Sequence, residues 1–599
     1  MADQYVSVRN LRFLLHEVFK VSELSRFEHY EHYDREAADM TIDASKQLSD
    51  KLLFPILTEM DRNKAYFSEG SVKVHPKLRS VIKNIAEGGW ISAHNTFEQG
   101  GQQMPLTLLN AALFIMYAAN GNAAAYAFLT QGAANLLQSF GSEELKSAFI
   151  PKMYSGDWQG TMALTEPQAG SSLSDLLSTA EPTEEGHYKI TGQKIYISGG
   201  DHEAVDNVVH LLLARIKGAP AGTKGISLFV VPKLREENGA LVSNDVSTAG
   251  IYGKMGQKGY VAAHLMLGEG SDCRGYLVGQ PHMGLRYMFQ MMNEARIATG
   301  LMAAATASGA YYASLQYTQE RAQGRPPSSK DLTQPPVLII EHADVRRMLL
   351  FQKAVVEGSK SLLLQCSYYA DLEMVASGED KQKAHLLLEL LTPIAKSYPA
   401  EMGIRSVSEG MQCLGGAGYC DDFPLEQYYR DIRVNSIYEG TTTIHGMDLL
   451  GRKVLMQDGR AMKLFAAEVE KVIQEALKEE ALRPFAGKLG QAIKDLGKTT
   501  YHLVGLAQQE SPEVFLADAT LYLDFFSLVT IGWQWLLQGV HAQRGLATAT
   551  ADTDRHFYEG KLITMRYFME YELPKIAGLQ ARLHSSERVT MEARAHHFA

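Results

Sequence analysis

One acidic residue, Glu439, stands among apolar and hydroxyl residues in the stretch RVNSIYEGTTTIHG, residues 433–446. No basic residue adjoins it in the chain. A carboxylate that loses its hydration, with no cation to compensate, has a raised pKa, which suits a general base near neutral pH. Gly440 permits close backbone approach, and the threonines after it can donate hydrogen bonds or cap a helix. The alternative interpretation is an ordinary acid in an exposed loop or at a helix start.

Two stretches earlier in the chain have patterns typical of ligand contact. MALTEPQAGSSLSD, residues 162–175, is a loop whose proline, glycine and serines can direct backbone N–H groups at a phosphate, with an ordinary turn as the alternative. In GQKIYISGGD, residues 192–201, the period of two places Tyr196 and Ser198 on one face of a strand. There an aromatic ring and a hydroxyl can both meet a flat ligand ring, and a cross-strand surface pair is the alternative.

The glycines of MQCLGGAGYCDD, residues 411–422, lie close to the end of an expected helix. Their spacing is superficially that of a dinucleotide-binding loop, but no strand precedes them and no βαβ unit surrounds them. We therefore reject a Rossmann interpretation. A tight turn that touches a ligand through its backbone remains open.

The composition excludes several other functions. A net charge of −10 over 599 residues disfavours nonspecific binding to nucleic acid or acidic lipid. The four cysteines are scattered, which fits a reducing, cytoplasmic location and indicates neither a disulfide framework nor a metal site. The N-terminal stretch MADQYVSVRN does not have the pattern of a signal peptide. Polar residues interrupt the apolar run at 106–131, which predicts two buried helices joined by a turn and no transmembrane segment.

The elements that must hold these stretches follow from hydrophobic periodicity. Apolar residues return every three or four positions up to about residue 160, then short β-rich runs follow, and long helical segments resume. A polar, proline-rich loop at 323–336 separates two of the long helices. In the last section, the aromatics of YLDFFSLVTIGWQWLLQGV have helical spacing and are expected to pack in a core or interface. The expected domains are 1–160 (helical), 161–281 (β-barrel), 282–455 (helical bundle) and 456–599 (helical).

Four ordered motifs, LTEPQAGSS, GQKIYIS, QCLGGAGY and IYEGTT, resemble those of the acyl-CoA dehydrogenase family of flavoenzymes, over roughly residues 40–455. The extra C-terminal section, GKMGQKG at 253–259 and QERAQGR at 319–325 are most similar to the large subgroup that includes 3-methylthiopropionyl-CoA dehydrogenase and long-chain bacterial enzymes. The resemblance implies a mostly α fold: a helical domain, an inserted β-barrel and a four-helix bundle, plus an extra helical domain. FAD would lie between barrel and bundle.

The resemblance also assigns roles to residues. Leu164 and Thr165 would contact the flavin ring, and Tyr196 and Ser198 would lie near its N5 atom. The set expected to bind FAD is Leu164, Thr165, Ser171, Tyr196, Ser198, Arg321, Gln412, Gly415, Gly416, Thr441 and Thr443, with the phosphate and adenine end held partly by a neighbouring subunit. The set expected at the substrate is Ser171, Arg296 and Gly440, with Arg296 near the CoA portion. Arg321 as a helix-end charge and Arg296 as a buried pairing partner are the alternatives.

Two departures from the family pattern concern these roles. The usual R-x-x-F-G is replaced by RAQGRPPSS after Arg321, which puts an aromatic contact to the adenosine in doubt. Tyr196 stands where many members have Trp, and Gln168 where many have Gly. Neither change removes a reactive group.

The resemblance implies FAD-dependent α,β-dehydrogenation of an acyl-CoA in fatty acid β-oxidation, with Glu439 removing the α-proton. An electron-transfer flavoprotein or similar acceptor would reoxidise the flavin. An acyl-CoA oxidase that uses O2, a non-catalytic flavoprotein of the same fold and a plain helical scaffold are the alternatives. The C-terminal section would fill a surface that shorter relatives use for a second pair of subunits, so a homodimer is expected.

Overall fold

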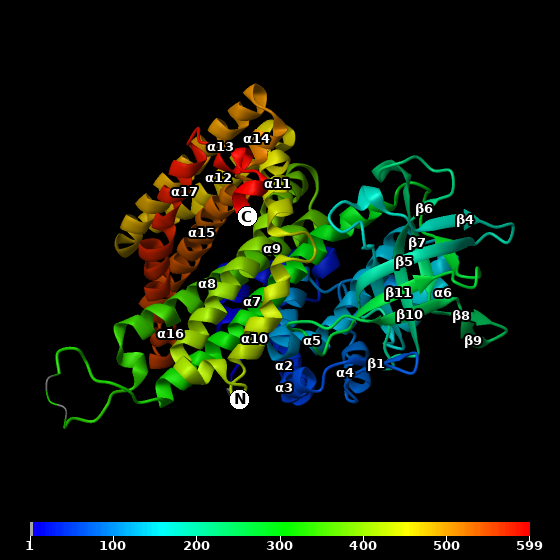
Figure 1. Ribbon diagram of the computed structural model, residues 1–599. Helices are drawn as coiled ribbons and strands as arrows, with labels where there is room; N and C mark the ends of the chain where they lie inside the picture. Colours follow the sequence, from blue (N-terminus) through cyan, green and yellow to red (C-terminus); the bar gives the residue numbers. More distant parts are fainter. Residues whose placement is uncertain (1–3, 330, 332) are drawn as a thin grey trace. The chain divides into compact units, whose positions relative to one another are not determined.

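The computed structural model describes residues 4–329, 331 and 333–599, with only the backbone described at 289–292 (Figure 1). The first three residues of the N-terminal stretch, and two positions of the proline-rich loop, lie outside the described residues. The chain divides into two compact units. Unit 1 comprises Met1–Ile42, Pro105–Phe114 and Arg296–Ala599, and unit 2 comprises Asp43–Met104 and Ile115–Ala295.

Unit 2 contains a helical part built around a break in one long helix. α5 (Leu106–Phe140) contains a non-helical residue, Asn120, at φ −164° and ψ 90°. The Asn120 side chain accepts a hydrogen bond from the Ala123 N–H at 3.1 Å and donates to the Leu53 carbonyl at 3.2 Å. Because an asparagine in extended conformation caps a helix in this way, the second part of α5 starts afresh there. The predicted pair of buried helices with a turn between them is confirmed.

The other elements of this part are short. α4 (Leu78–Glu87) is amphipathic, with Leu78, Val81, Ile82 and Ile85 all buried at helical spacing. The other elements are α3 (Leu57–Arg62), β1 (Tyr66–Ser68), β2 (Ser71–Lys73) and α6 (Glu143–Tyr154).

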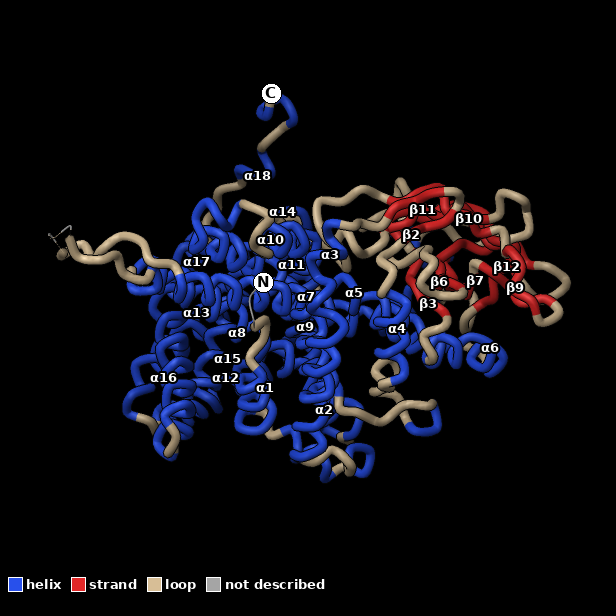
Figure 2. The backbone as a smooth tube through the Cα atoms, turned by 90° about the horizontal axis from the view of Figure 1, so that it is seen from below, coloured by secondary structure: helices blue, strands red, loops and turns tan. Residues whose placement is uncertain are grey.

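The rest of unit 2 is a β-barrel, drawn in red in Figure 2. Strand pairing runs from β5 through β12, β7, β6 and β4 back to β5, so these five strands close a ring. β11 and β10 extend the sheet from β5, and β3 pairs in parallel with β6. The strands are β3 (Trp158–Ala163), β4 (Thr179–Pro182), β5 (Tyr188–Ser198), β6 (Asn207–Ile216), β7 (Ile226–Pro232), β10 (Val246–Ile251), β11 (Ala262–Leu267) and β12 (Arg274–Leu277).

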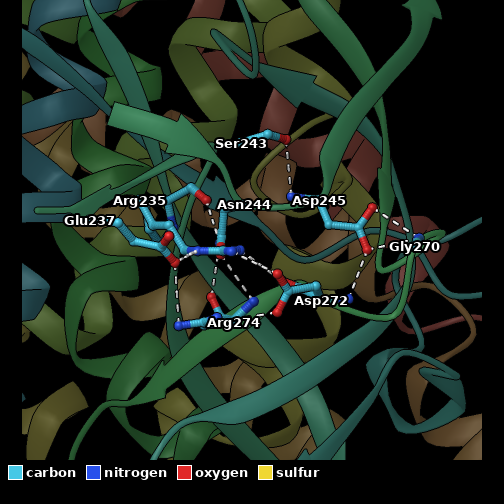
Figure 3. Close-up of polar contacts among 9 residues, drawn as sticks. Arg235, Glu237, Ser243, Asn244, Asp245, Gly270, Asp272 and Arg274 are labelled. Atoms are coloured by element: carbon cyan, nitrogen blue, oxygen red, sulfur yellow. Dashed lines mark hydrogen bonds and ion pairs between the residues drawn. The ribbon is translucent and has the colours of Figure 1, made fainter. Parts of the chain in front are cut away.

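A small hairpin, β8 (Leu234–Glu237) with β9 (Ala240–Ser243), is fastened to the barrel by charged and amide groups (Figure 3). Arg235 donates to Glu237 at 2.6 Å and to Asp272 at 2.7 Å. The Asn244 amide donates to the carbonyls of Pro232 and Arg274 at 2.7 and 3.0 Å. These bonds fix the hairpin base to the start of β12.

Unit 1 contains a bundle of long helices. They are α7 (Gly284–Glu320), α8 (Ala343–Val375), α9 (Gly378–Leu414), α10 (Leu425–Ile432) and α11 (Thr442–Gly451), with the N-terminal α1 (Val8–Arg12) and α2 (Arg35–Leu48). α2, α5 and α7 cross the boundary between the two units. The predicted loop between α7 and α8 closes at its base, where the N–H of Gln323 donates to the Val337 carbonyl at 2.9 Å. α9 ends at Leu414, so a helix and not a strand precedes the glycine turn.

The C-terminal helices of unit 1 are α12 (Met456–Leu477), α13 (Arg483–Gln509), α14 (Pro512–Leu516), α15 (Ala519–Thr548), α16 (Asp552–Tyr567), α17 (Ile576–Leu583) and α18 (Val589–Glu592). α15 packs against α8, α11, α12 and α16. Trp533 and Trp535 on α15 are fully buried, and the Trp535 indole donates to the Ala354 carbonyl of α8 at 3.0 Å. These aromatics therefore pack in a core, and the predicted fold class is confirmed.

Two segments, Leu106–Phe140 and Pro512–Thr548, are long and apolar enough to cross a membrane by length and composition alone. In their most apolar windows, 89% and 61% of the residues are buried inside the structure. Burial in a protein core accounts for such apolar character without a membrane.

Candidate active site

The Glu439 turn connects the 3-10 turn η11 (Arg433–Ser436) with α11 in unit 1. Glu439 has φ +55° and Gly440 has φ +89°. Glycine adopts such angles without strain, whereas an L side chain at Glu439 is held there against its preference, as is common at functional sites. A Cβ atom added to Gly440 would lie 3.0 Å from the His445 Nε2 atom. The position therefore favours glycine for both its backbone angle and its space.

Two buried side chains hold the carbonyl groups of this turn. His445 Nε2 lies 3.1 Å from the carbonyl oxygen of Glu439, and Lys396 Nζ on α9 donates to the carbonyl oxygen of Gly440 at 2.8 Å. Burial lowers the pKa of His445 to about 3, so its ring is neutral. Since a carbonyl can only accept, the proton of the neutral ring is on Nε2. Both peptide groups of the turn are thus fixed.

The electrostatics of Glu439 correct one sequence expectation. The expectation of a carboxylate without a neighbouring cation is wrong, because α9 and α7 bring Lys396 and Arg296 close enough to lower its pKa. Burial has the larger effect, and the pKa of Glu439 lies above its ordinary value. Both cations bond elsewhere: Lys396 to a carbonyl, and Arg296 to Asp448 at 2.9 Å. Hence Glu439 is only partly neutralised.

Arg296 is 6% exposed, and its ion pair matches the alternative interpretation of a buried pairing partner. Asp448 also accepts from Arg452 at 2.7 Å. Burial lowers the pKa of Lys396 to about 8, so Lys396 is still protonated at neutral pH. Contact between Arg296 and CoA stays a prediction.

The threonines after Gly440 differ in their roles. Thr441 occupies the N-cap position of α11, but its side chain makes no capping bond. The Thr442 hydroxyl donates to Glu401 of α9. Thr443 is exposed. One of the threonines therefore donates a hydrogen bond, as the sequence suggested. The FAD contacts of Thr441 and Thr443 stay predictions.

The barrel in unit 2 carries the second group of predicted residues. Leu164 and Thr165 follow β3 and are half-buried, and Leu164 packs on the barrel core. The Thr165 carbonyl accepts from the Ile195 N–H of β5 at 3.0 Å. The loop and the strand carrying Tyr196 and Ser198 are therefore directly bonded.

Tyr196 departs from a regular strand. Its φ is +59°, and the pairing of β5 with β11 shifts register at this point, as in a β-bulge. Lys194 and Ile195 are consequently both buried, so the expected alternation fails there. Tyr196, at the bulge, is 59% exposed and Ser198, after it, is half-buried, so the two share the outward face as predicted. The Tyr196 ring lies 4.3 Å from the Tyr252 ring.

Sequence reasoning missed a buried ion pair beneath this face. Lys194 Nζ donates to Glu166 at 2.7 Å and to the Leu164 carbonyl at 3.0 Å. Glu166 also accepts from the N–H groups of Leu177 and Ser178 at 2.7 and 3.1 Å. The pair joins the 162–175 loop to β5. A lysine directly before the apolar positions Ile195 and Ile197, with an acid in the preceding loop motif, was the available signal.

The remaining predicted residues lie on exposed turns. Ser171 is exposed beside Gly170, and a Cβ atom on Gly170 would meet nothing within 4 Å. In unit 1, Arg321 follows α7, and Gln412, Gly415 and Gly416 lie at the end of α9, all of them exposed. The Tyr317 ring near the end of α7 packs at 5.4 Å against the ring of Phe423, which lies between the glycine turn and α10. The structure thus brings Arg321 and the glycine turn to one end of the bundle.

Within the described ranges, no group of three or more His, Cys, Asp or Glu side chains is arranged to hold a metal ion.

Four family models match successive parts of the chain. They are described as acyl-CoA dehydrogenase N-terminal domain (35–157), middle domain (161–268) and C-terminal domain (282–455), and as acetyl-CoA dehydrogenase C-terminal like (465–594). Together they cover all four sections of the sequence.

Curated relatives match along the whole chain. A 3-methylmercaptopropionyl-CoA dehydrogenase of Ruegeria pomeroyi is 33% identical over 96% of this chain and 97% of its own length. The broad-specificity linear acyl-CoA dehydrogenase FadE5 of Mycobacterium tuberculosis is 31% identical over 98% of both chains.

Two solved structures share the fold. The structure of Caenorhabditis elegans ACDH-11 in complex with C11-CoA aligns with a TM-score of 0.75 at 20% identity, covering 93% of this chain and 92% of that one. An acyl-CoA dehydrogenase from Bacillus anthracis complexed with FAD aligns with a TM-score of 0.71 at 21% identity, covering 94% and 90%. The two curated relatives, together with the four family models, show that the chain belongs to the acyl-CoA dehydrogenase family and is an enzyme of that family.

Proposed function

We propose that this enzyme oxidises an acyl-CoA thioester to the trans-2-enoyl-CoA with FAD, and that Glu439 is the base that removes the α-proton. The observation that carries the assignment is the geometry of the Glu439 turn: the acid is half-buried at φ +55°, and the two nearby cations bond to other groups, Lys396 to the Gly440 carbonyl and Arg296 to Asp448. Loss of hydration then keeps the pKa of Glu439 above its ordinary value. A base must keep its affinity for a proton, and a direct ion pair would remove that affinity.

The residues of the barrel fit a flavin. Tyr196 and Tyr252 present a half-exposed pair of rings on the outward face of the sheet, suited to a flat ring system. Ser198 carries a hydroxyl on the same face as Tyr196, and Thr165 is bonded through its carbonyl to the Ile195 N–H of this strand. The buried Glu166–Lys194 pair joins the loop to the strand. FAD, when bound, supplies the acceptor for the hydride that leaves the β-carbon.

The protein's own part in the reaction is acid–base and electrostatic. The Glu439 carboxylate takes the α-proton, and the C–H electron pair becomes the new double bond as hydride leaves the β-carbon. The Glu439 backbone N–H is proposed to donate to the thioester carbonyl and so to stabilise the developing enolate. The bonds from His445 and Lys396 hold the two peptide groups that follow this N–H, those of the Glu439 and Gly440 carbonyls. The acyl chain excludes water and strengthens these interactions.

The substrate class follows from the relatives. One is named for 3-methylmercaptopropionyl-CoA and another for linear acyl-CoAs of broad range. We propose a CoA thioester of a saturated acyl chain as substrate, and an electron-transfer flavoprotein or similar protein as electron acceptor.

We also propose a homodimer. The residues assigned to the adenine end, among them Arg321 and Gly415, are exposed in one chain, which suits a site shared with a second copy. The C-terminal domain covers part of the bundle through the packing of α15 on α8, and we propose that it takes the place of a second pair of subunits there. Sedimentation equilibrium is expected to give a dimer, and a tetramer would contradict this proposal.

The decisive experiment is anaerobic titration of the purified flavoprotein with acyl-CoAs that differ in length, branching and sulfur content, followed by the loss of oxidised-flavin absorbance. Glu439→Gln should bind FAD and substrate yet fail to bleach. Glu373→Gln is the matched control. It also removes one carboxylate, on α8 and paired with His385 at 2.9 Å, and its flavin should bleach normally. Bleaching by Glu439→Gln would remove the base assignment, and a wild-type protein unable to bind FAD would remove the whole proposal.

A further inference from the structure

Lys396 is an unusual residue for its position. It lies on α9 among Leu391, Ile394 and Ala395, all buried, and is itself 0% exposed. A buried ammonium group is costly unless it is hydrogen-bonded and its charge is balanced. Its ammonium donates a hydrogen bond to the Gly440 carbonyl at 2.8 Å, and the anions that act on it are Glu401 and Glu439.

The packing of α7 against α9 helps to place Lys396 beside the Gly440 carbonyl. Pro399 has no N–H to bond the Ala395 carbonyl one turn earlier. Gly300 of α7 packs against that carbonyl so closely that a Cβ atom would lie 2.0 Å from it. α7 and α9 therefore pack closely one residue before Lys396, and Arg296 lies one turn before Gly300 on α7.

We propose that Lys396 is a positioning residue for the reaction: it fixes the Gly440 carbonyl of the catalytic turn and places a compensating charge beside the Glu439 carboxylate. This inference rests on the proposed function of Glu439. Because Glu439 sits in a left-handed conformation, its turn needs bonds that hold it in place, and Lys396 and His445 supply one for each of two successive peptide groups.

The charged groups around the turn come from four elements. α9 contributes Lys396 and Glu401, α7 contributes Arg296, the turn contributes Glu439, and α11 contributes Asp448 together with the neutral His445. Asp448 is the partner of Arg296, and Glu401 accepts from Thr442. Removal of the Lys396 charge would leave Glu439 with Arg296 as its remaining compensating cation in this set. The pKa of Glu439 would then rise further.

The test compares Lys396→Met, Lys396→Gln and Lys396→Arg in FAD-loaded enzyme. The rate of anaerobic flavin bleaching is measured at saturating acyl-CoA between pH 5.5 and 9. For Lys396→Met, the expected result is a rate roughly 10–100-fold lower at pH 7, since the turn is no longer held in productive geometry. The acid limb of its pH profile should also move to higher pH by about one pH unit or more, because an opposite charge has been removed.

Lys396→Gln keeps a hydrogen-bond donor without the charge, so its acid limb should move while its rate at high pH stays closer to wild type. Lys396→Arg keeps the charge and should restore the position of the acid limb. Lys360→Met is the matched control: Lys360 is 1% exposed on α8, and burial lowers its pKa to about 7, so it carries charge over the acid limb. The cations that act on Glu439 are Lys396 and Arg296, so the acid limb of Lys360→Met should not move.

Two outcomes would overturn the inference. One is a Lys396→Met or Lys396→Gln enzyme whose acid limb coincides with that of wild type, whether or not its rate is lower. The other is an equal shift in Lys360→Met, which would indicate a general effect of losing a buried cation. Circular dichroism and flavin content show which variants fold, and Lys396→Gln replaces Lys396→Met in the test if the latter does not. Glu439→Gln in the same assay separates the two proposals: its bleaching would overturn the proposed function, whereas an inert Glu439→Gln with unmoved Lys396 variants would overturn the Lys396 role alone.

Discussion

Glu166 in unit 2 is buried and Glu439 in unit 1 is half-buried; both carboxylates lose hydration, yet their pKa values move in opposite directions. Glu166 has Lys194 at 2.7 Å and accepts two backbone N–H bonds, and its pKa is lowered despite burial. Glu439 has two cations nearby that bond to other groups, and its pKa is raised. Burial alone therefore does not decide how a carboxylate behaves. What decides it is whether the nearby cation bonds to the carboxylate itself or to another group.

The cluster in Figure 3 supports the same rule near the surface. Asp272 is paired with Arg235 at 2.7 Å and with Arg274 at 3.3 Å, and its pKa is lowered by them even though burial opposes this. In both places the carboxylate that holds strands or loops together is directly paired. The candidate base differs from them in this respect.

The largest effect on stability is expected at the buried pair of the barrel. Glu166→Gln leaves the Lys194 ammonium buried without its partner, which typically costs about 3–5 kcal/mol. Urea unfolding of the variant, monitored with flavin content, measures the loss. The double variant Glu166→Gln/Lys194→Met removes the stranded charge and should recover much of the stability. If Glu166→Gln alone unfolded at the wild-type urea midpoint, the direct ion pair would not stabilise the barrel, and the contrast drawn between Glu166 and Glu439 would be wrong.

A smaller effect is expected from Gly440→Ala. Alanine at φ +89° costs about 1–2 kcal/mol, and its Cβ atom would press on His445 Nε2. We expect slower bleaching of the flavin as well as lower thermal stability, because the hydrogen bond from His445 Nε2 holds the Glu439 carbonyl. Gly487→Ala on α13 is the control, since its backbone is helical and a Cβ atom there meets nothing within 4 Å. A Gly440→Ala enzyme with full rate would show that the turn tolerates distortion.

Glu439 and Glu166 should contribute to the free energy of unfolding with opposite dependence on pH. The raised pKa of Glu439 gives stability that is present below its unfolded pKa, near 4.5, and is lost as pH rises through the folded pKa. The lowered pKa of Glu166 gives stability that is present above 4.5 and is lost as pH falls through the folded pKa. When the folded and unfolded pKa values of a group differ by one, the free energy of unfolding changes by about 1.4 kcal/mol.

Thermal unfolding from pH 4 to pH 8 measures this difference. Glu439→Gln should be as stable as wild type at pH 4 and more stable at pH 8, while Glu166→Gln should be less stable at pH 8 and approach wild type as the pH falls. A Glu439→Gln enzyme that is destabilised at pH 8 would indicate an ion pair of the Glu166 kind.

The smallest effect is expected at the surface cluster. Arg235→Gln removes bonds to Glu237 and Asp272, whose side chains are 40% and 49% exposed. Solvent screens such pairs, so the expected loss is about 1 kcal/mol or less, with normal bleaching. Urea unfolding of Arg235→Gln beside Glu166→Gln tests the ranking. An equal loss in both would show that burial has little influence on the strength of these pairs.

Much of the molecule was readable from local patterns. The helical, β and helical order, the break near Asn120 and the core role of the Trp533–Trp535 stretch follow from periodicity and from the capping chemistry of asparagine. The bulge at Tyr196 was not readable, because it depends on how β5 pairs with β11, which lies more than sixty residues away. The Glu166–Lys194 pair was missed for the same reason: two charged residues in separate motifs do not reveal that they face each other.

The sequence by itself determined the family, the order of the elements and the turn in which Glu439 precedes Gly440, since each depends on residues close together in the chain. The tertiary structure alone decided the environment of that turn: Lys396 comes from 43 positions earlier on α9, and Arg296 comes from α7. A pKa responds to charge and water within a few ångströms in space, and sequence distance carries no information about either. For this reason the sequence could indicate Glu439 as the candidate base, whereas the cations that lower its pKa were found only in the folded chain.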